Sequence, residues 1–113
     1  VSYMFRMKVV TKVERESIGK IVLLAASVDG KISVSEREAF RQMTEEWPSD
    51  EKRSVVRSVI ADSVNLEKVA HALHSRVAKR LAYAATLQMC KADGHVSAYE
   101  SLFLRRLAQL LNT

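Results

Sequence analysis

One short segment recurs in this chain and constrains its fold more than any other feature. Residues 28–36 and 92–100 both contain Asp-Gly-x-(Ile/Val)-Ser-x-x-Glu, at an offset of 64 residues. Each copy follows an apolar stretch with helical spacing and precedes another such stretch. Chance recurrence of all five positions in so short a chain is improbable. We therefore predict two related halves, each with two helices joined by an Asp-Gly loop.

The serine and glutamate of each copy match the signature of a capping box. In that arrangement the serine hydroxyl and the glutamate carboxylate each accept a backbone N–H at the start of a helix. A third box precedes the first copy, and the expected boxes are Thr11 with Glu14, Ser33 with Glu36, and Ser97 with Glu100. Gly30 and Gly94 are expected to end the preceding helices as left-handed caps.

Residues that break helices are few in the rest of the chain. The whole sequence contains only three glycines and one proline, which favours helices over sheets. Ser49 and Asn65 are further expected helix caps. Helices are predicted over residues 12–28, 33–47, 49–60, 65–73, 76–92 and 97–111. Residues 1–10 are expected to form a docked arm or a short extra helix, and residues 11–113 a single domain. The predicted fold class is a compact all-α bundle of six or seven helices.

Helical spacing also predicts which side chains are buried. On the third and fourth helices these are Val55, Val56, Val59, Ile60, Leu66, Val69, Ala70 and Leu73. On the last two helices they are Val77, Leu81, Ala84, Ala85, Leu87, Leu102, Phe103, Leu104, Leu107, Leu110 and Leu111. Cys90 lies in an apolar stretch and is expected to be a small core residue.

Composition restricts the class of function. The formal net charge is +5, but the densest basic groups are the pairs 52–53, 79–80 and 105–106, without interleaved aromatic residues, so nucleic-acid binding is not expected. No nucleophile elbow, phosphate-binding glycine loop or zinc-protease motif occurs, so we expect no enzyme activity. The single cysteine excludes a disulfide within the chain and makes a reducing cytoplasmic location the default expectation.

Asp29 and Asp93 are the residues of the repeat that need an explanation. A carboxylate near a helix C-terminus is unfavourable by about 0.3–1 kcal/mol, and this happens in both copies. One explanation is structural, with each aspartate accepting backbone N–H groups in an Asx-type turn. The other is a cation held between Asp and Glu across each loop. Glu36 and Glu100 have a sufficient structural role in their capping boxes.

A helix ending in Val-Asp-Gly or Ala-Asp-Gly, then an aliphatic residue, Ser and Glu, resembles the TerB-like domain of tellurite-resistance proteins. The resemblance covers residues 17–111. It implies an all-helical fold with the two Asp-Gly loops close together, and a metal-associated stress-response or scaffold role. The metal ligands it implies are Asp29, Glu36, Asp93 and Glu100. It also implies a protein partner and, as an option, peripheral association with the inner membrane face.

Two functions remain open on the sequence. The first is a non-catalytic TerB-like module that binds a divalent metal ion through the two Asp-Gly loops, which the duplicated aspartates favour. The second is a metal-free protein-interaction scaffold, which the flanking Lys31 and Lys91 favour. A weaker hypothesis is a transition-metal site from Glu67, His71 and His74, which would share one face of a helix at spacings i, i+4 and i+7.

Overall fold

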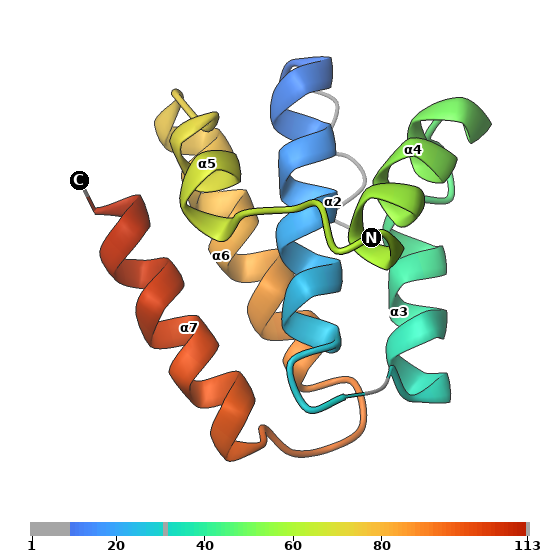
Figure 1. Cartoon of the computed structure of the whole chain (residues 1–113), viewed down its shortest axis with the longest axis vertical. Coiled ribbons are helices and arrows are strands. Elements are labelled where there is room, and N and C mark those ends of the chain that lie inside the picture. The colour runs from blue at the N-terminus through green and yellow to red at the C-terminus, as the bar shows by residue number, and fades with distance from the viewer. Residues whose placement is uncertain (1–9, 31, 113) are drawn as a thin grey trace.

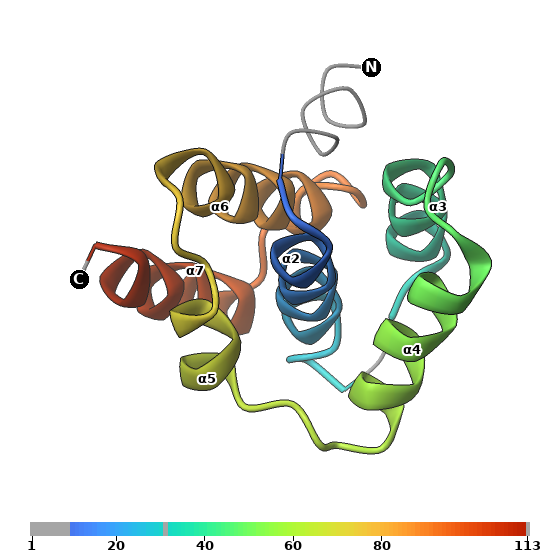
Figure 2. The same ribbon diagram turned by 90° about the horizontal axis from the view of Figure 1, so that it is seen from above.

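Helix α2 (Lys12–Ala26) runs through the centre of the molecule and contacts all five other helices. Viewed from above, the other helices surround it (Figure 2). Such an environment requires apolar residues on more than one face of the helix. The α2 sequence meets that requirement, because Ile18, Ile21, Val22, Ala25 and Ala26 are each at most 1% exposed.

The computed structural model describes residues 10–30 and 32–112. The other elements, in chain order, are α3 (Val34–Met43), α4 (Ser49–Ile60), α5 (Leu66–His71), α6 (Arg76–Cys90) and α7 (Ala98–Leu111). They pack into a globule with extents of 31 × 31 × 29 Å (Figure 1). The all-α prediction is confirmed for the described residues. The predicted arm or helix over residues 1–10 lies outside them except for Val10, which is buried in the core.

Most predicted helix starts are confirmed. All three capping boxes form with both of their hydrogen bonds, and Asn65 caps α5 by accepting the Lys68 N–H at 3.1 Å. The prediction for Ser49 is wrong, because Pro48 holds the N-cap position of α4 and no side chain caps that helix. Ser75, which the sequence prediction missed, caps α6 by accepting the Ala78 N–H.

Four of the six predicted helix ends are too late, whereas those of α4 at Ile60 and α7 at Leu111 are confirmed. Helix α2 stops at Ala26 and α6 at Cys90, so neither Gly30 nor Gly94 is the terminal cap. Helix α3 stops at Met43, where the Thr44 hydroxyl donates to the Phe40 carbonyl oxygen at 2.8 Å. Thr86 makes the same kind of bond to the Ala82 carbonyl within α6, which continues to Cys90, so this bond does not by itself set the end of α3.

Three residues predicted to be buried are exposed instead. Ile60 is 79% exposed, Val77 48% and Leu102 60%. The buried residues Leu104, Leu107 and Leu111 show that α7 packs through one stripe only, with Leu102 outside it. Apolar periodicity indicates that a helix has a buried face, but the width of that face is set by how many neighbours the helix has.

Gly19 allows α2 to approach the segment around α4 closely. A Cβ atom at this position would lie 3.0 Å from Trp47 Cη2 and 3.2 Å from Val55 Cγ1. Both distances are shorter than ordinary carbon–carbon contact. The absence of a side chain here therefore decides how closely the centre of the bundle packs.

We predict that Gly19→Val lowers the free energy of unfolding by about 1–3 kcal/mol, because overpacking forces neighbouring groups apart. Denaturant unfolding followed by circular dichroism measures the change. Lys20→Val is the control, since it introduces the same β-branched residue at a less buried position of the same helix. Equal losses in the two variants would contradict the packing role of Gly19.

The Glu14 carboxylate joins the start of α2 to the start of α6. Its Oε1 atom accepts the Thr11 N–H at 3.2 Å, closing the capping box of α2. Its Oε2 atom accepts from His74 N at 3.2 Å and from Ser75 N and Oγ at 3.1 Å each. Burial raises the pKa of Glu14, but the hydrogen bonds from Ser75, Thr11 and His74 outweigh it and lower the pKa below its usual value.

We predict that Glu14→Gln destabilises the fold by about 1.5–3 kcal/mol, because the charged acceptor of several buried N–H groups is lost. The wild-type carboxylate contributes fully above its unfolded pKa, near 4.5, and this contribution is lost as the pH falls through the lower folded pKa. Urea unfolding at neutral and acidic pH measures both effects. Glu16→Gln, on the same helix, should change stability little; a loss matching that of Glu14→Gln would refute the link.

Candidate functional site

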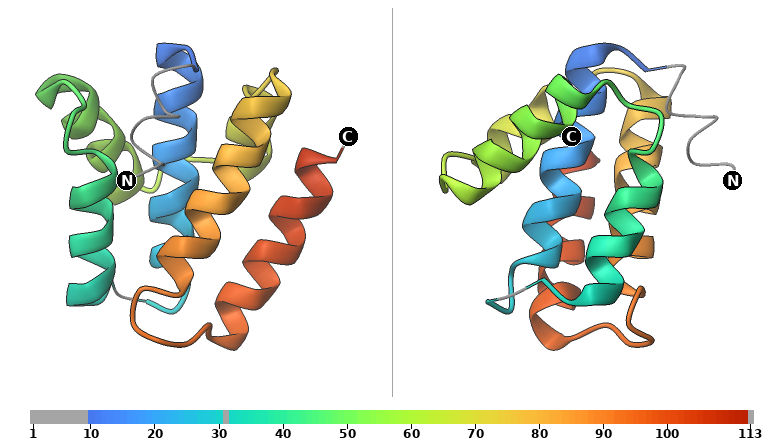
Figure 3. Two further views of the ribbon diagram at one scale, coloured as in Figure 1. Left: turned by 180° about the vertical axis from the view of Figure 1, so that it is seen from behind. Right: turned by 90° about the vertical axis from the view of Figure 1, so that its right-hand side faces the viewer.

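The two Asp-Gly loops lie at the same end of the molecule. One joins α2 to α3 and the other joins α6 to α7, and both are at the lower end in the views of Figures 1 and 3. The arrangement agrees with the expectation from the sequence that the loops are close together. It follows from the packing of α2 along α6, with the C-terminal ends of both helices at that end of the bundle.

The two loops share the same turn geometry. In each, the glycine N–H donates to a carbonyl three residues earlier, from Gly30 to Ser27 at 3.1 Å and from Gly94 to Lys91 at 3.0 Å. The φ angles of the two glycines are 102° and 97°, in the left-handed region that favours glycine. The glycines therefore turn the chain after the helix has already ended.

Glu36 and Glu100 are held by their capping boxes and are buried. Glu36 Oε1 accepts the Ser33 N–H at 2.8 Å, and Glu100 Oε1 accepts the Ser97 N–H at 2.9 Å. Each residue is only 2% exposed. Glutamates at this position usually lie near solvent at the first turn of a helix, so the burial of both is a consequence of how the first turns of α3 and α7 are packed.

The two carboxyl groups face one another in the interior. Burial is the largest cause that raises the pKa of Glu36, and a hydrogen bond and Coulombic repulsion from Glu100 add to it. No N–H or hydroxyl of the described residues reaches the buried Glu100 Oε2 atom. Two facing carboxylates with one oxygen lacking a donor need either a shared proton or a cation.

Cys90 lies near this carboxyl pair, at the end of α6. Its side chain is fully buried, as expected, in a small cluster with Ala25 and Leu104. Burial raises the pKa of the Cys90 thiol to about 12, with added repulsion from Glu100, Glu36, Asp93 and Asp29. A thiol with so high a pKa is not a nucleophile at neutral pH. All four predicted carboxylates act on this one thiol, which places them at one end of the bundle.

Asp29 and Asp93 differ from the glutamates because they remain exposed. Helix α2 ends at Ala26, so Asp29 lies beyond the last turn rather than within it. No N–H group of the described residues donates to the Asp93 side chain, so the predicted Asx-type turn does not form in the second loop. For Asp29, the N–H two residues on belongs to Lys31, which lies outside the described residues, so that turn stays a prediction. Within residues 10–30 and 32–112, no three His, Cys, Asp or Glu side chains converge closely enough to hold a metal ion.

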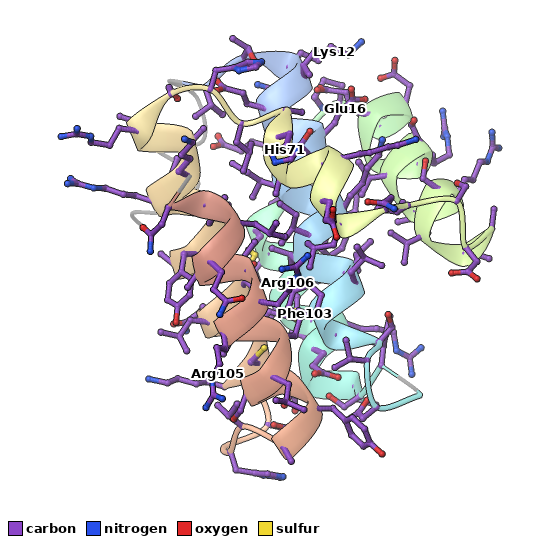
Figure 4. All side chains as sticks on the ribbon, turned by 60° about the vertical axis from the view of Figure 1, so that its left-hand side comes forward. Lys12, Glu16, His71, Phe103, Arg105 and Arg106 are labelled. Carbon is purple, nitrogen blue, oxygen red and sulfur yellow. The ribbon has the colours of Figure 1, made fainter. Side chains whose placement is uncertain are left out.

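The predicted histidine site has a different arrangement from the one expected. Helix α5 ends at His71, so His74 lies beyond it and the two do not share a helical face. Glu67 instead pairs with Arg106 of α7, with Oε1 and Nη2 2.7 Å apart. Figure 4 labels His71 on α5 and Arg106 on the neighbouring α7. The hypothesis of a metal site on one face of this helix is therefore wrong.

Among the residues that the structure describes, no helix is both long and apolar enough to cross a membrane.

We predict that Glu36→Gln stabilises the protein at neutral pH in metal-free buffer, by about 1–2 kcal/mol. Glutamine can keep the capping-box acceptor, and its amide can donate a hydrogen bond to the neighbouring carboxylate. The raised pKa of Glu36 means that wild-type stability should fall as the pH rises from about 4.5 through the folded pKa, while the variant lacks that fall.

Chemical denaturation across that pH range, in the presence of a chelator, measures the difference. Glu38→Gln is the matched control, because Glu38 lies on the same helix but is 49% exposed and pairs with Arg41. A Glu36→Gln variant that is less stable than wild type at neutral pH, with an unchanged pH dependence, would show that the pair is not repulsive.

The comparisons with known proteins identify a family. Neither the curated proteins nor the solved structures gave a match to this chain. One family, described as "Protein of unknown function (DUF533)", matches residues 12–113, which cover all six described helices and both Asp-Gly loops. The chain therefore belongs to the DUF533 family.

Proposed function

We propose that this protein is a non-catalytic TerB-like module that binds a hydrated divalent cation between Glu36 and Glu100. The observation that carries the proposal is the buried Glu100 Oε2 atom, which no donor of the described residues reaches. It lies in a residue 2% exposed whose carboxyl group faces a second carboxyl group. A cation would neutralise both groups and hold the first turns of α3 and α7 together.

The donor set decides which ions suit this place. Two buried carboxylates without a third converging ligand do not match the closed tetrahedral cages of structural zinc. They do match Mg²⁺ and similar hard cations, which use one or two carboxylates and keep several water ligands. Asp29 and Asp93 lie in the adjacent loops and contribute negative potential there, which attracts cations toward the pair.

The relationship of the DUF533 family to TerB-like tellurite-resistance proteins supports the same proposal. The motif that carries the resemblance contains the four carboxylates at Asp29, Glu36, Asp93 and Glu100. A role in a cytoplasmic stress response is part of this proposal and rests on the resemblance alone.

The second candidate function is a metal-free protein-interaction scaffold. The raised pKa of Glu36 favours it, because a protonated Glu36 can donate a hydrogen bond to Glu100 and make a cation unnecessary. In that case the two Asp-Gly loops only shape the fold. Exposed Lys91, next to the second loop, also lowers the local negative potential.

A thermal melt in chelator-treated buffer distinguishes the two functions. We expect millimolar Mg²⁺ or Mn²⁺ to raise the Tm of the wild type, since an ion at 100 times its Kd adds about 2.7 kcal/mol. The increase should disappear in Glu36→Gln and in Glu100→Gln, and should shrink in Asp29→Asn/Asp93→Asn. Glu38→Gln should keep the full response, because its carboxylate is on the exposed surface of α3.

Two outcomes would overturn the cation proposal. A wild-type melt that no divalent ion shifts would leave the scaffold function as the better account. An ion-dependent shift of equal size in both glutamine variants would place the ion elsewhere on the protein.

A further inference from the structure

A groove with basic side chains lies at the opposite end of α6 from the carboxyl pair. It has a volume of about 660 Å³ and is bounded by the first half of α6 and the last turns of α7. Figure 3 shows these helices side by side, with the start of α6 near the end of α7. The fourteen-residue separation of Arg76 from Cys90 along α6 corresponds to about 20 Å, so the groove is separate from the proposed cation site.

The wall on α6 carries three cations on one helical face. Arg76, Lys79 and Arg80 line the groove together with Tyr83, at the spacings i, i+3, i+4 and i+7. None of the three cations forms an ion pair within the described residues, and no Asp or Glu is among the side chains that line the groove. These positive charges therefore have no internal partner that accounts for their position.

The potential of helix α6 itself adds to this charge. Its N-terminal end, which carries positive partial charge, opens next to the groove, and its first turn contains no acidic residue. The Glu14 carboxylate also reaches this end, where it accepts from His74 N and Ser75 N and offsets part of the helix potential. The three cations of the lining outnumber this one buried carboxylate, so the local charge balance at the groove is positive.

The opposite wall, on α7, offers a limited apolar surface. It is lined by Ala108, Leu111 and the polar Asn112, and Leu111 is only 9% exposed. A groove whose basic wall faces this limited apolar surface suits a chain that alternates acidic and apolar side chains. The cationic stripe from Arg76 to Tyr83 extends about 10 Å, which three or four residues of an extended peptide can span.

We propose that this groove docks an acidic, partly apolar segment of a partner protein. Carboxylates of the segment pair with Arg76, Lys79 and Arg80, the Tyr83 hydroxyl donates to a further oxygen, and small apolar side chains lie against Ala108 and the exposed edge of Leu111. A flat anionic membrane would pair with the exposed cations but would not enter the groove to reach Ala108. A nucleic acid would find one partly buried tyrosine and no series of stacking aromatics.

The probe for the test is a fluorescein-labelled peptide in which glutamate and leucine alternate. We expect fluorescence anisotropy to report saturable binding by the full chain at moderate salt. The triple variant Arg76→Gln/Lys79→Gln/Arg80→Gln should weaken binding by about tenfold, since each exposed pair is individually weak but three are lost. Lys52→Gln/Arg53→Gln/Arg57→Gln on α4 removes the same net charge elsewhere and should weaken binding by less than about twofold.

Two further measurements separate the alternatives. Backbone amide shifts on titration with the peptide should change around Tyr83 and Leu111, and both triple variants should retain the wild-type circular dichroism spectrum. The proposal is overturned by equal weakening in the two triples, which indicates nonspecific attraction, or by absence of saturable binding. It is equally overturned if vesicles containing phosphatidylserine bind through the α6 cations while the peptide does not.

Discussion

The packing of α2 against all five other helices is the constraint on which the rest of the structure depends. This central helix keeps only one partly exposed face, along Glu16, Lys20 and Leu24, so it needs small or apolar residues on its other sides. Gly19 meets this need toward Trp47 and Val55, where a Cβ atom would be too close. At its solvent end, the same helix uses the Glu14 carboxylate to hold the start of α6 in place.

The buried carboxyl pair is a consequence of that central packing. Glu36 and Glu100 are each in an ordinary place for a capping box, at the third position of a helix. Because both loops lie at one end of the bundle, the two first turns meet and the carboxyl groups become neighbours. The two capping boxes, which serve to start α3 and α7, therefore place two mutually repulsive carboxyl groups in the interior. A proton or a cation can neutralise this pair.

The charge distribution divides the molecule along α6. The end of this helix lies close to the carboxylates of the Asp-Gly loops and of the adjacent first turns, whereas its beginning carries the cations of the groove. The small overall charge of +5 conceals this division, because the acidic end and the basic groove offset one another in the sum. Local potential, rather than net charge, is therefore the quantity that governs which partners approach each end.

The sequence by itself determined the all-helical class, the three capping boxes and the glycine turns of both loops. These features depend on residues within a few positions of one another, so the physics that creates them is visible locally. The ends of α2, α3, α5 and α6 were predicted two to four residues too late, since apolar spacing indicates which face of a helix is buried and not where the helix stops. The sequence also shows that Asp29 and Asp93 occupy equivalent positions of the repeat, but it does not show that both side chains are exposed to solvent.

Only the tertiary structure decided which predicted faces are covered and which side chains meet. Ile60, Val77 and Leu102 are exposed because no neighbouring helix covers their side of the helix that carries them. The meeting of Glu36 with Glu100, and the groove between α6 and α7, depend on contacts between segments far apart in the chain. The spacing of apolar residues shows that each helix has an apolar side. Which helix covers that side, and which polar groups are brought together as a result, is decided only when the bundle assembles.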